Sequence, residues 1–236
     1  MHAVILAAGR GTRMQGLTAY TPKPLLEVSG KSLLVHKLEA LPPEVTEVII
    51  VIGYQGEQIT AALGDSHAGR PIRYVVQEEL NGTAGALWLC APYLTGRFIV
   101  MMGDDLYARE DIERTIASPD WAALVAVTNH MGMGGRMVVD EHDFITEMEE
   151  GDHRGTQGLM NTNLLALDAR VFSYSLIPKA PGSHEYGLPH TVLAAAHAWH
   201  IPMHAVYASG WFQITAPEDL ARAEIMLSSA VPTGSA

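Results

Sequence analysis

Apolar stretches alternate with segments of helical periodicity through the first half of the chain. Four apolar stretches, several of them rich in β-branched residues, are each expected to form a buried strand, at residues 2–8, 47–53, 72–77 and 97–105. Segments that repeat apolar residues at helical spacing lie between them, at residues 32–41, 57–63 and 83–94. Repeated strand and helix units predict an α/β protein with a mainly parallel sheet.

The pattern changes after residue 105. Four apolar stretches separated by short polar turns predict further strands, at residues 121–129, 135–141, 144–150 and 161–168. Two helical segments follow at residues 186–199 and 217–227, and residues 229–236 are expected to form a flexible tail. Short strands joined by short turns favour a mixed or antiparallel extension of the sheet.

Composition and charge narrow the class of protein. The chain has 236 residues, of which 48% are apolar, and this length suits one large domain. No apolar run reaches the ~20 residues of a membrane span, and the N-terminus lacks the pattern of a signal peptide, which predicts a cytoplasmic protein. A formal charge of −11 argues against general nucleic-acid binding. Cys90, the single cysteine, is expected to be a buried structural thiol.

The stretch LAAGRGTRM at residues 6–14 follows the first predicted strand. Glycines such as Gly9 and Gly11 allow a backbone to approach phosphate groups closely, and Arg13 offers a bidentate partner. The stretch matches neither the Walker pattern nor the dinucleotide pattern. Taken alone, it is equally compatible with a phosphate-binding loop and with an ordinary turn into a helix.

Two carboxylates, Asp104 and Asp105, end the fourth predicted strand. Open α/β sheets bind ligands at the carboxyl ends of their strands, and Mg²⁺ takes few protein carboxylates together with substrate phosphates. The position therefore predicts a Mg²⁺ site. Asp104 is favoured as the ligand, and Asp105 as a cap of the following turn.

Six motifs resemble, in order, those of the sugar-1-phosphate nucleotidyltransferases. The first is the opening of the chain, made of the loop at 6–14 and the TPKPLL segment that follows it. The other five are VVQEELNGTAGAL (75–87), VMMGDDLY (100–107), GRMVV (135–139), MNTNLLALD (160–168) and WFQITAPEDLARAE (211–224). The resemblance implies a Rossmann-like three-layer α/β/α sandwich. It also implies transfer of a nucleotidyl group from a nucleoside triphosphate to a sugar 1-phosphate, with release of pyrophosphate and with Mg²⁺ as the cofactor.

The resemblance assigns roles to individual residues. Arg13, Lys23 and Asp104 are the implied catalytic residues: Arg13 holds the departing phosphates, Lys23 stabilises charge at the α-phosphate and Asp104 binds the metal. The implied nucleotide-binding residues are Ala7, Ala8, Gly9, Gly11, Thr12, Arg13, Gln77, Gly82 and Thr83. The implied sugar-phosphate-binding residues are Gly135, Glu150 and Asn161.

The chain departs from the pattern of the family at two positions. Gln213 stands where many relatives have a second metal-ligating Asp or Asn, so it is a weaker candidate ligand with a neutral oxygen. Gly151 stands where many relatives have a lysine that faces the phosphate of the acceptor. His153, Arg154 and Arg136 are the alternatives for that missing charge, and the sequence does not choose among them.

The resemblance also implies a domain organisation, and two alternative functions remain open beside it. It implies a single domain over residues 1–228, with a nucleotide-binding half to about residue 108 and a sugar-phosphate-binding half after it, and it leaves a homo-oligomer open. The absent lysine keeps open a cytidylyltransferase for phosphocholine or inositol phosphate. Gln213 and Gly151 together keep open a regulator that binds nucleotide or sugar with little catalysis.

Overall fold

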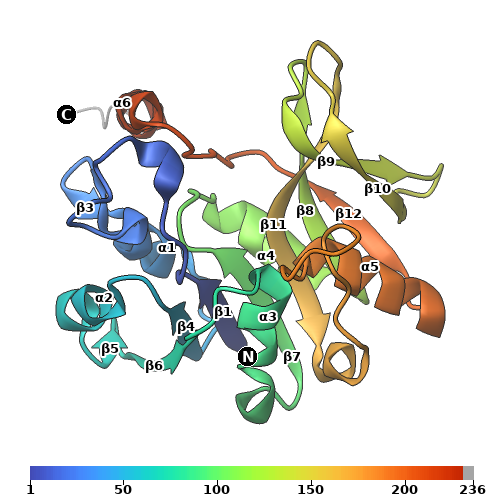
Figure 1. Cartoon of the computed structure of the whole chain (residues 1–236), viewed down its shortest axis with the longest axis horizontal. Coiled ribbons are helices and arrows are strands. Elements are labelled where there is room, and N and C mark those ends of the chain that lie inside the picture. The colour runs from blue at the N-terminus through green and yellow to red at the C-terminus, as the bar shows by residue number, and fades with distance from the viewer. Residues whose placement is uncertain (231–236) are drawn as a thin grey trace, which may run out of the picture.

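The computed structural model describes residues 1–230, apart from the side chains of residues 133, 134, 150, 229 and 230. A ten-stranded mixed sheet forms its centre (Figure 1). β1 (His2–Leu6) lies between β4 (Glu47–Ile52) and β7 (Arg97–Met102), and β4 pairs on its other side with β6 (Arg70–Val76). All three pairings are parallel, as the four buried apolar stretches predict.

The second half of the chain extends this sheet with mostly antiparallel strands. β11 (Gly158–Asp168) pairs antiparallel with β7 and with two strands of its own half. The remaining strands of the sheet are β5 (Ser66–His67), β8 (Trp121–Thr128), β9 (Met133–Val139), β10 (Ile145–Asp152) and β12 (Met203–Tyr207). The predicted antiparallel extension is confirmed, and β9 and β10 project from the body of the protein (Figure 1).

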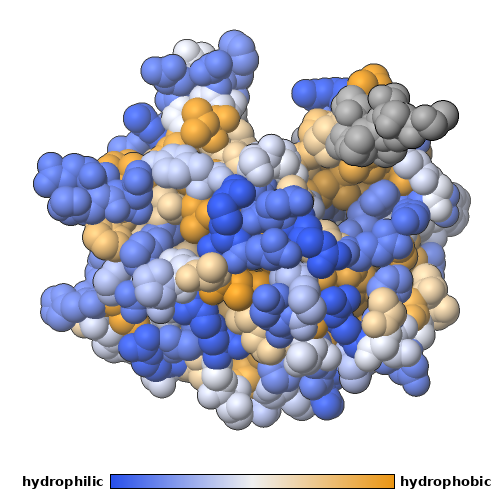
Figure 2. Space-filling view, turned by 180° about the vertical axis from the view of Figure 1, so that it is seen from behind, coloured by the Kyte–Doolittle hydropathy of each residue, from blue (hydrophilic) through white to orange (hydrophobic). Residues whose placement is uncertain are grey.

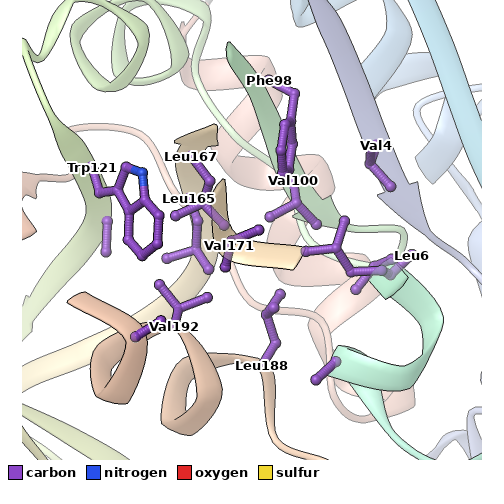
Figure 3. Close-up of a cluster of buried hydrophobic side chains, with 14 of the residues drawn as sticks. Val4, Leu6, Phe98, Val100, Trp121, Leu165, Leu167, Val171, Leu188 and Val192 are labelled. Atoms are coloured by element: carbon purple, nitrogen blue, oxygen red, sulfur yellow. The ribbon is translucent and has the colours of Figure 1, made fainter. Parts of the chain in front are cut away.

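Helices cover both faces of the sheet, so the three-layer α/β/α sandwich is confirmed. Alternate residues of β1 contribute to two different cores: Val4 and Leu6 to one, Ala3 and Ile5 to the other. The first core contains α3 (Thr83–Trp88) and α5 (Leu188–Trp199), and Figure 3 shows Leu188 of α5 near Leu6. The second core contains α1 (Leu33–Ala40), α2 (Gly56–Leu63) and α4 (Arg109–Ala117).

A third, smaller core joins the two ends of the chain. The helix α6 (Pro217–Ala230) lies beside the hairpin of β2 (Glu27–Val28) and β3 (Lys31–Ser32), as Figure 1 shows. Met14, Val28 and Ile214 are buried together there. The short 3-10 helices are η1 (Thr12–Met14), η2 (Lys23–Leu25), η3 (Ala91–Tyr93) and η4 (Ala169–Ser173). This packing holds the segment before α6 against the glycine-containing loop.

Three expectations about elements differ from the structure. The helix expected over residues 83–94 ends at Trp88 and gives way to η3, because Pro92 has no N–H to donate to the carbonyl of Trp88. No helix is expected over α4, whose nine residues include five charged ones, and no strand over the five-residue β12. Helix α6 runs two residues into the expected tail, and the rest of that tail lies outside the described residues.

A smaller expectation concerns the thiol of Cys90. Cys90 is fully buried, and burial raises the pKa of its thiol to about 12, so it is a structural cysteine as expected. On the face shown in Figure 2, hydrophobic residues form small patches between hydrophilic ones. Among the described residues, none of the helices has the length and apolar character that a membrane span requires.

Candidate active site

The loop after β1 is held by backbone hydrogen bonds to the neighbouring strand. The N–H of Ala7 donates to the Val51 carbonyl at 2.8 Å, and the Ala8 carbonyl accepts from the N–H of Tyr54 at 3.1 Å. Gly9 and Arg10, which follow, are exposed to solvent. The loop therefore leaves the sheet at its carboxyl edge with part of its backbone open to a ligand.

Gly11 has a conformation and a contact that require glycine. Its φ of +62° lies in the left-handed region, and a Cβ atom there would stand 2.9 Å from the Cβ of Lys23. The Oγ1 of Thr18 donates to the Gly11 carbonyl at 3.1 Å. The close packing brings the loop directly onto the side chain of Lys23, which lies between two prolines in η2.

Lys23 joins three segments that are distant in the sequence. Its side chain is only 6% exposed, and its Nζ donates to Oδ2 of Asp104 at 2.5 Å. The same Nζ donates to the main-chain carbonyl of Ile214, the residue after Gln213. The predicted catalytic pair is thus in direct contact, although 81 positions separate the two residues in the sequence.

The two carboxylates after β7 have different environments. The side chain of Asp104 is 27% exposed and lines a small cavity of about 60 Å³ with Gly9, Gly11 and Lys23. Asp105 is buried, and burial, followed by the charge of Asp104, raises its pKa to about 7. Its Oδ2 accepts from the indole N–H of Trp211 at 3.2 Å, so the expectation that Asp105 caps the next turn is wrong.

A buried lysine that was not predicted from the sequence, Lys37, holds the segment that follows β7. Lys37 in α1 donates from Nζ to the main-chain carbonyl of Asp105 and lies 5.0 Å from the ring centre of Tyr107. Burial lowers the pKa of Lys37 to about 8. The signal was present, because Lys37 falls three residues after Leu34 on the apolar face of its helix.

A second cavity, of about 310 Å³, lies beside the loop and gathers most of the predicted nucleotide-binding residues. It is lined by Ala8, Gly9, Gln77, Gly82 and Thr83, among others. Gln77 is buried, and its Nε2 donates to Oδ1 of Asn81 at 3.0 Å and to the Gly82 carbonyl at 3.2 Å. The remaining predicted residues lie nearby: Ala7 lines the small cavity, and Thr12 is exposed at the start of η1.

Gly82 joins the first half of the chain, which contains the predicted nucleotide-binding residues, to the second half. Its φ is +97°, and a Cβ atom would stand 2.5 Å from the carbonyl oxygen of Tyr186. The N–H of Tyr186 donates to the Asn81 carbonyl at 2.7 Å, and its carbonyl accepts from the N–H of Ala84 at 3.1 Å. Residues 81–84 and Tyr186 are therefore docked backbone to backbone.

The third cavity, which is the largest of the three at about 450 Å³, opens between the first and second halves of the chain. Arg13 and Gln213 line it from the first half and from the segment before α6, and Gly135 and Asn161 line it from the second half. Further lining residues include Gly82, Thr83, Met102, Asn163, Lys179, Glu185, Tyr186 and His190. Glu150 pairs with Gly135 across β10 and β9, and its side chain lies outside the described part of the structure.

The structure supplies a cation that the sequence analysis did not consider. His153 contacts the Glu149 carbonyl at 2.9 Å, and Arg154 pairs with Asp152; neither these two residues nor Arg136 lines the largest cavity. Lys179 does line it, from a turn in which its N–H donates to the Glu185 carbonyl at 2.7 Å. Lys179 is the one lysine in residues 38–236, which is the signal that could have indicated it.

The oxygen donors of the site suit a hard divalent cation bound with help from the substrate. The described residues contain no group of three or more His, Cys, Asp or Glu side chains placed to hold a metal. Asp104 offers a partly exposed carboxylate at the small cavity, and Gln213 offers a neutral side chain at the adjoining one. One carboxylate plus phosphate oxygens and water is a common Mg²⁺ environment.

Comparison with known families identifies the chain. Residues 2–132 match the family described as nucleotidyl transferase. The chain belongs to this nucleotidyl transferase family. It is 28% identical over 239 residues to the UTP–glucose-1-phosphate uridylyltransferase AglF of Haloferax volcanii, with 95% of each chain covered. The bifunctional protein GlmU of Methanocaldococcus jannaschii is 29% identical over 173 residues, which are 73% of this chain but only 41% of GlmU.

Solved structures of two nucleotidyltransferase relatives share the fold. A Bacillus anthracis protein described as a glucose-1-phosphate thymidylyltransferase, solved with sucrose, superposes with a TM-score of 0.82 at 24% identity and covers 100% of this chain and 98% of its own. The inositol-1-phosphate CTP transferase from T. maritima superposes with a TM-score of 0.74 at 21% identity, covering 100% and 97%. At these identities the likeness establishes the Rossmann-like fold of the nucleotidyl transferase family.

Proposed function

We propose that this chain transfers a nucleotidyl group from a nucleoside triphosphate to a sugar 1-phosphate, giving a nucleoside-diphosphate sugar and pyrophosphate. The observation that carries the proposal is the position of Lys23. Its ammonium group contacts Asp104, and the carbon chain of its side chain packs against Gly11 at the small cavity. A loop for phosphates, a buried cation and a metal-binding carboxylate thus meet at one point.

The triphosphate fits across the loop, with its base in the 310 Å³ cavity. Gln77 lines that cavity, and because its Nε2 is held by Asn81 and Gly82, its Oε1 is the atom that can accept a hydrogen bond from the edge of a base. The backbone N–H groups of Gly9 and Gly11 face the phosphates, and Arg13 reaches the departing β- and γ-phosphates from its place in the largest cavity. The α-phosphate then lies near Lys23.

The reaction is a single displacement at phosphorus. An oxygen of the acceptor phosphate forms a bond to the α-phosphorus, and the bond from that phosphorus to the bridging oxygen breaks, so that pyrophosphate leaves with the electron pair. Lys23 neutralises charge on the non-bridging oxygens of the α-phosphate as the transition state forms. Mg²⁺, held by Asp104 with Gln213 as a neutral second ligand, would supply further charge neutralisation at the phosphate oxygens.

The acceptor occupies the largest cavity, opposite Arg13. Gly135 of β9 and Asn161 of β11 line one wall, and Glu150 of β10 pairs with Gly135 behind it. Lys179 supplies the positive charge that binds the phosphate of the acceptor. It replaces the lysine that many relatives have at the position of Gly151. Both substrates therefore approach the reaction centre with their phosphates between Arg13, Lys23 and Lys179.

The lining of the cavity favours a polyhydroxylated acceptor over phosphocholine. Recognition of a quaternary ammonium group uses a cage of several aromatic rings. Among the described residues that line the cavity, Tyr186 is the one with a phenol or indole ring, while Asn161 and Asn163 offer amides. Cytidylyl transfer to inositol phosphate, also a polyol, is therefore the second candidate. We further propose a cytoplasmic site of action, where nucleoside triphosphates are available.

A turnover assay with two lysine variants tests the proposal. The protein is incubated with Mg²⁺, a panel of triphosphates and a panel of sugar, inositol and choline phosphates, and release of pyrophosphate is measured. Lys23→Ala should lower kcat/KM about 100-fold or more, because it removes a preorganised cation at the reacting phosphate. Lys31→Ala is the matched control, since Lys31 is half exposed and pairs with Glu39.

The outcomes separate the three hypotheses. Turnover of a sugar 1-phosphate by the unmodified protein and by Lys31→Ala, but not by Lys23→Ala, supports the proposal. Preferred turnover of CTP with an inositol phosphate supports the second candidate. Nucleotide binding by calorimetry without turnover on the full panel contradicts both and supports the regulator.

A further inference from the structure

We propose that Asn163 is a specificity-determining residue of the acceptor cavity, where its side-chain amide donates to an oxygen of a polyhydroxylated acceptor. The inference rests on the function proposed above and assigns a role that the motif around Asn161 does not include. Asn163 lines the 450 Å³ cavity and is partly buried. Three independent features of β11 place it there.

The first feature is a break in the pairing of β11. Asn161 lies opposite Val125 of β8, but Leu165 lies opposite Ala123, so two extra residues are accommodated on β11. On its other edge β11 pairs with β9 up to Met160 and with β7 from Leu165 onward. Residues 161–164 thus form a bulge at the point where β11 changes partners, and the cavity opens there.

The second feature is the anchoring of the bulge from behind. Thr162 and Leu164 are fully buried. The Oγ1 of Thr162 donates to the Leu124 carbonyl at 2.8 Å, and its own carbonyl accepts from the hydroxyl of Tyr107 at 2.8 Å. Because the alternate residues are fixed in the core, Asn161 and Asn163 are both directed to the cavity side.

The third feature is the backbone of Asn163 itself. Its φ is +58°, a left-handed conformation that asparagine adopts more readily than most residues but that glycine adopts without cost. The turn therefore does not require a side chain at this position. A non-glycine residue held in this region at the wall of a binding cavity points to a role for the side chain.

The hydrogen bonds of the pair leave a donor for the acceptor. Oδ1 of Asn161 accepts from the backbone N–H of Asn163, and Nδ2 of Asn161 donates to Oδ1 of Asn163, both at 2.9 Å. Within the described part of the chain, Nδ2 of Asn163 has no hydrogen-bond partner. A hydroxyl or ring oxygen of the acceptor can accept a hydrogen bond from this Nδ2. An acceptor that lacks this oxygen leaves Nδ2 without a partner.

Two substitutions separate this role from a purely structural one. Asn163→Gly keeps the left-handed turn and removes the amide. Asn163→Asp also tolerates the turn and keeps an oxygen for Asn161, but it loses the donor and adds negative charge beside a phosphorylated acceptor. A residue that only shapes the turn would tolerate both changes, so both variants should then behave like the unmodified protein.

The experiment measures steady-state kinetics with the sugar 1-phosphate that the unmodified protein uses best and with its monodeoxy analogues. We expect Asn163→Gly to raise the KM for the acceptor about tenfold and to leave the KM for the triphosphate within about twofold. Asn163→Asp should raise the acceptor KM further. The unmodified protein should have a higher KM for one deoxy analogue than for the complete sugar 1-phosphate. Asn163→Gly should have similar KM values for these two acceptors.

The results distinguish the failure of this inference from that of the proposed function. Turnover by the unmodified protein, with unchanged acceptor KM and unchanged deoxy selectivity in both folded variants, overturns the role of Asn163 alone. Absence of turnover in the unmodified protein overturns the proposed function and this inference with it. Thermal unfolding of each variant establishes that the kinetics compare folded proteins.

Discussion

Adjacent residues in this site differ in chemistry because they differ in burial. Asp104 and Asp105 follow one another after β7, yet the first is partly exposed at a cavity and the second is buried under Trp211. Residues 102–105 alternate between partly buried and buried, so the alternation of β7 continues for three residues past its end at Met102 and places one carboxylate at the cavity and the other in the core. Two acidic residues in a sequence therefore do not imply two metal ligands.

Lys179 is the residue whose role in the site most needs a direct test. We expect Lys179→Ala to raise the KM for a phosphorylated acceptor by about ten- to a hundredfold, because a charge-assisted hydrogen bond to phosphate is lost. The KM for the triphosphate should change little. Steady-state kinetics with each substrate varied in turn measure both values.

Arg154→Ala is the matched control for Lys179→Ala. Arg154 carries the same charge in the same half of the chain, but it pairs with Asp152 and does not line the cavity. Its removal should leave both KM values unchanged. If Arg154→Ala weakened acceptor binding and Lys179→Ala did not, the phosphate would be held by Arg154 and not by Lys179.

At the scale of the elements, the segment from 178 to 186 and the loop from 81 to 84 act as one unit. Pro178 and Tyr186 form an isolated β-bridge. The N–H and the carbonyl of Tyr186 are both hydrogen-bonded to the backbone of residues 81–84. The Oγ1 of Thr83 adds a bond from the N–H of Leu188 at 3.1 Å, at the start of α5. The position of Lys179 thus depends on a contact with the first half of the chain.

Gly82→Ala should disrupt this unit. A Cβ atom there would lie 2.5 Å from a backbone oxygen, in a conformation with positive φ, so the change should cost more than about 1 kcal/mol of stability. Because Gly82 lines both large cavities, the KM should rise for both substrates. Thermal unfolding and two-substrate kinetics measure these effects.

Gly96→Ala is the control for Gly82→Ala. Gly96 has no positive φ, is exposed, and a Cβ atom there would meet nothing within 4 Å. The Gly96→Ala variant should have the same Tm as the unmodified protein and the same KM values for both substrates. A Gly82→Ala protein that matched Gly96→Ala in all three measurements would show that the contact with Tyr186 is dispensable.

The sequence predicts the elements of the first half better than those of the second. Strands buried on both faces, such as β4 and β7, stand out as apolar runs, and the carboxyl ends of parallel strands necessarily meet at one edge. Hence the approach of Lys23 to the end of β7 follows from its motif and from the fold. Helix α4 has no such signal, because charged residues cover most of its surface.

Lys179 and the bulge at Asn163 show what a local pattern cannot contain. Lys179 reaches the cavity through a turn docked on residues about a hundred positions earlier in the chain. The bulge arises because β11 exchanges one neighbouring strand for another. Both depend on tertiary pairing, and neither is encoded in the spacing of nearby residues.

At the scale of the whole molecule, the two halves share their main core. Val4 and Leu6 of β1 belong to the same cluster as Trp121 of β8 and Leu188 and Val192 of α5 (Figure 3). Neither half could bury these side chains by itself. This sharing favours the prediction of a single domain over residues 1–228, which an unfolding experiment tests.

We therefore expect the chain to unfold as one cooperative unit, including both halves of the site. Trp88 lies in the first half, and Trp121 and Trp199 in the second, so tryptophan fluorescence follows both. Fluorescence and far-UV circular dichroism should give one coincident transition in urea. A triphosphate with Mg²⁺ at 100 times its Kd should stabilise that transition by about 2.7 kcal/mol.

Two separate transitions, with only the first responding to nucleotide, would contradict this expectation. A nucleotide that stabilised one half alone would mean that the contact of Tyr186 with residues 81–84 is too weak to join them. A single shifted transition would instead mean that the two halves unfold together and share the stabilisation by nucleotide.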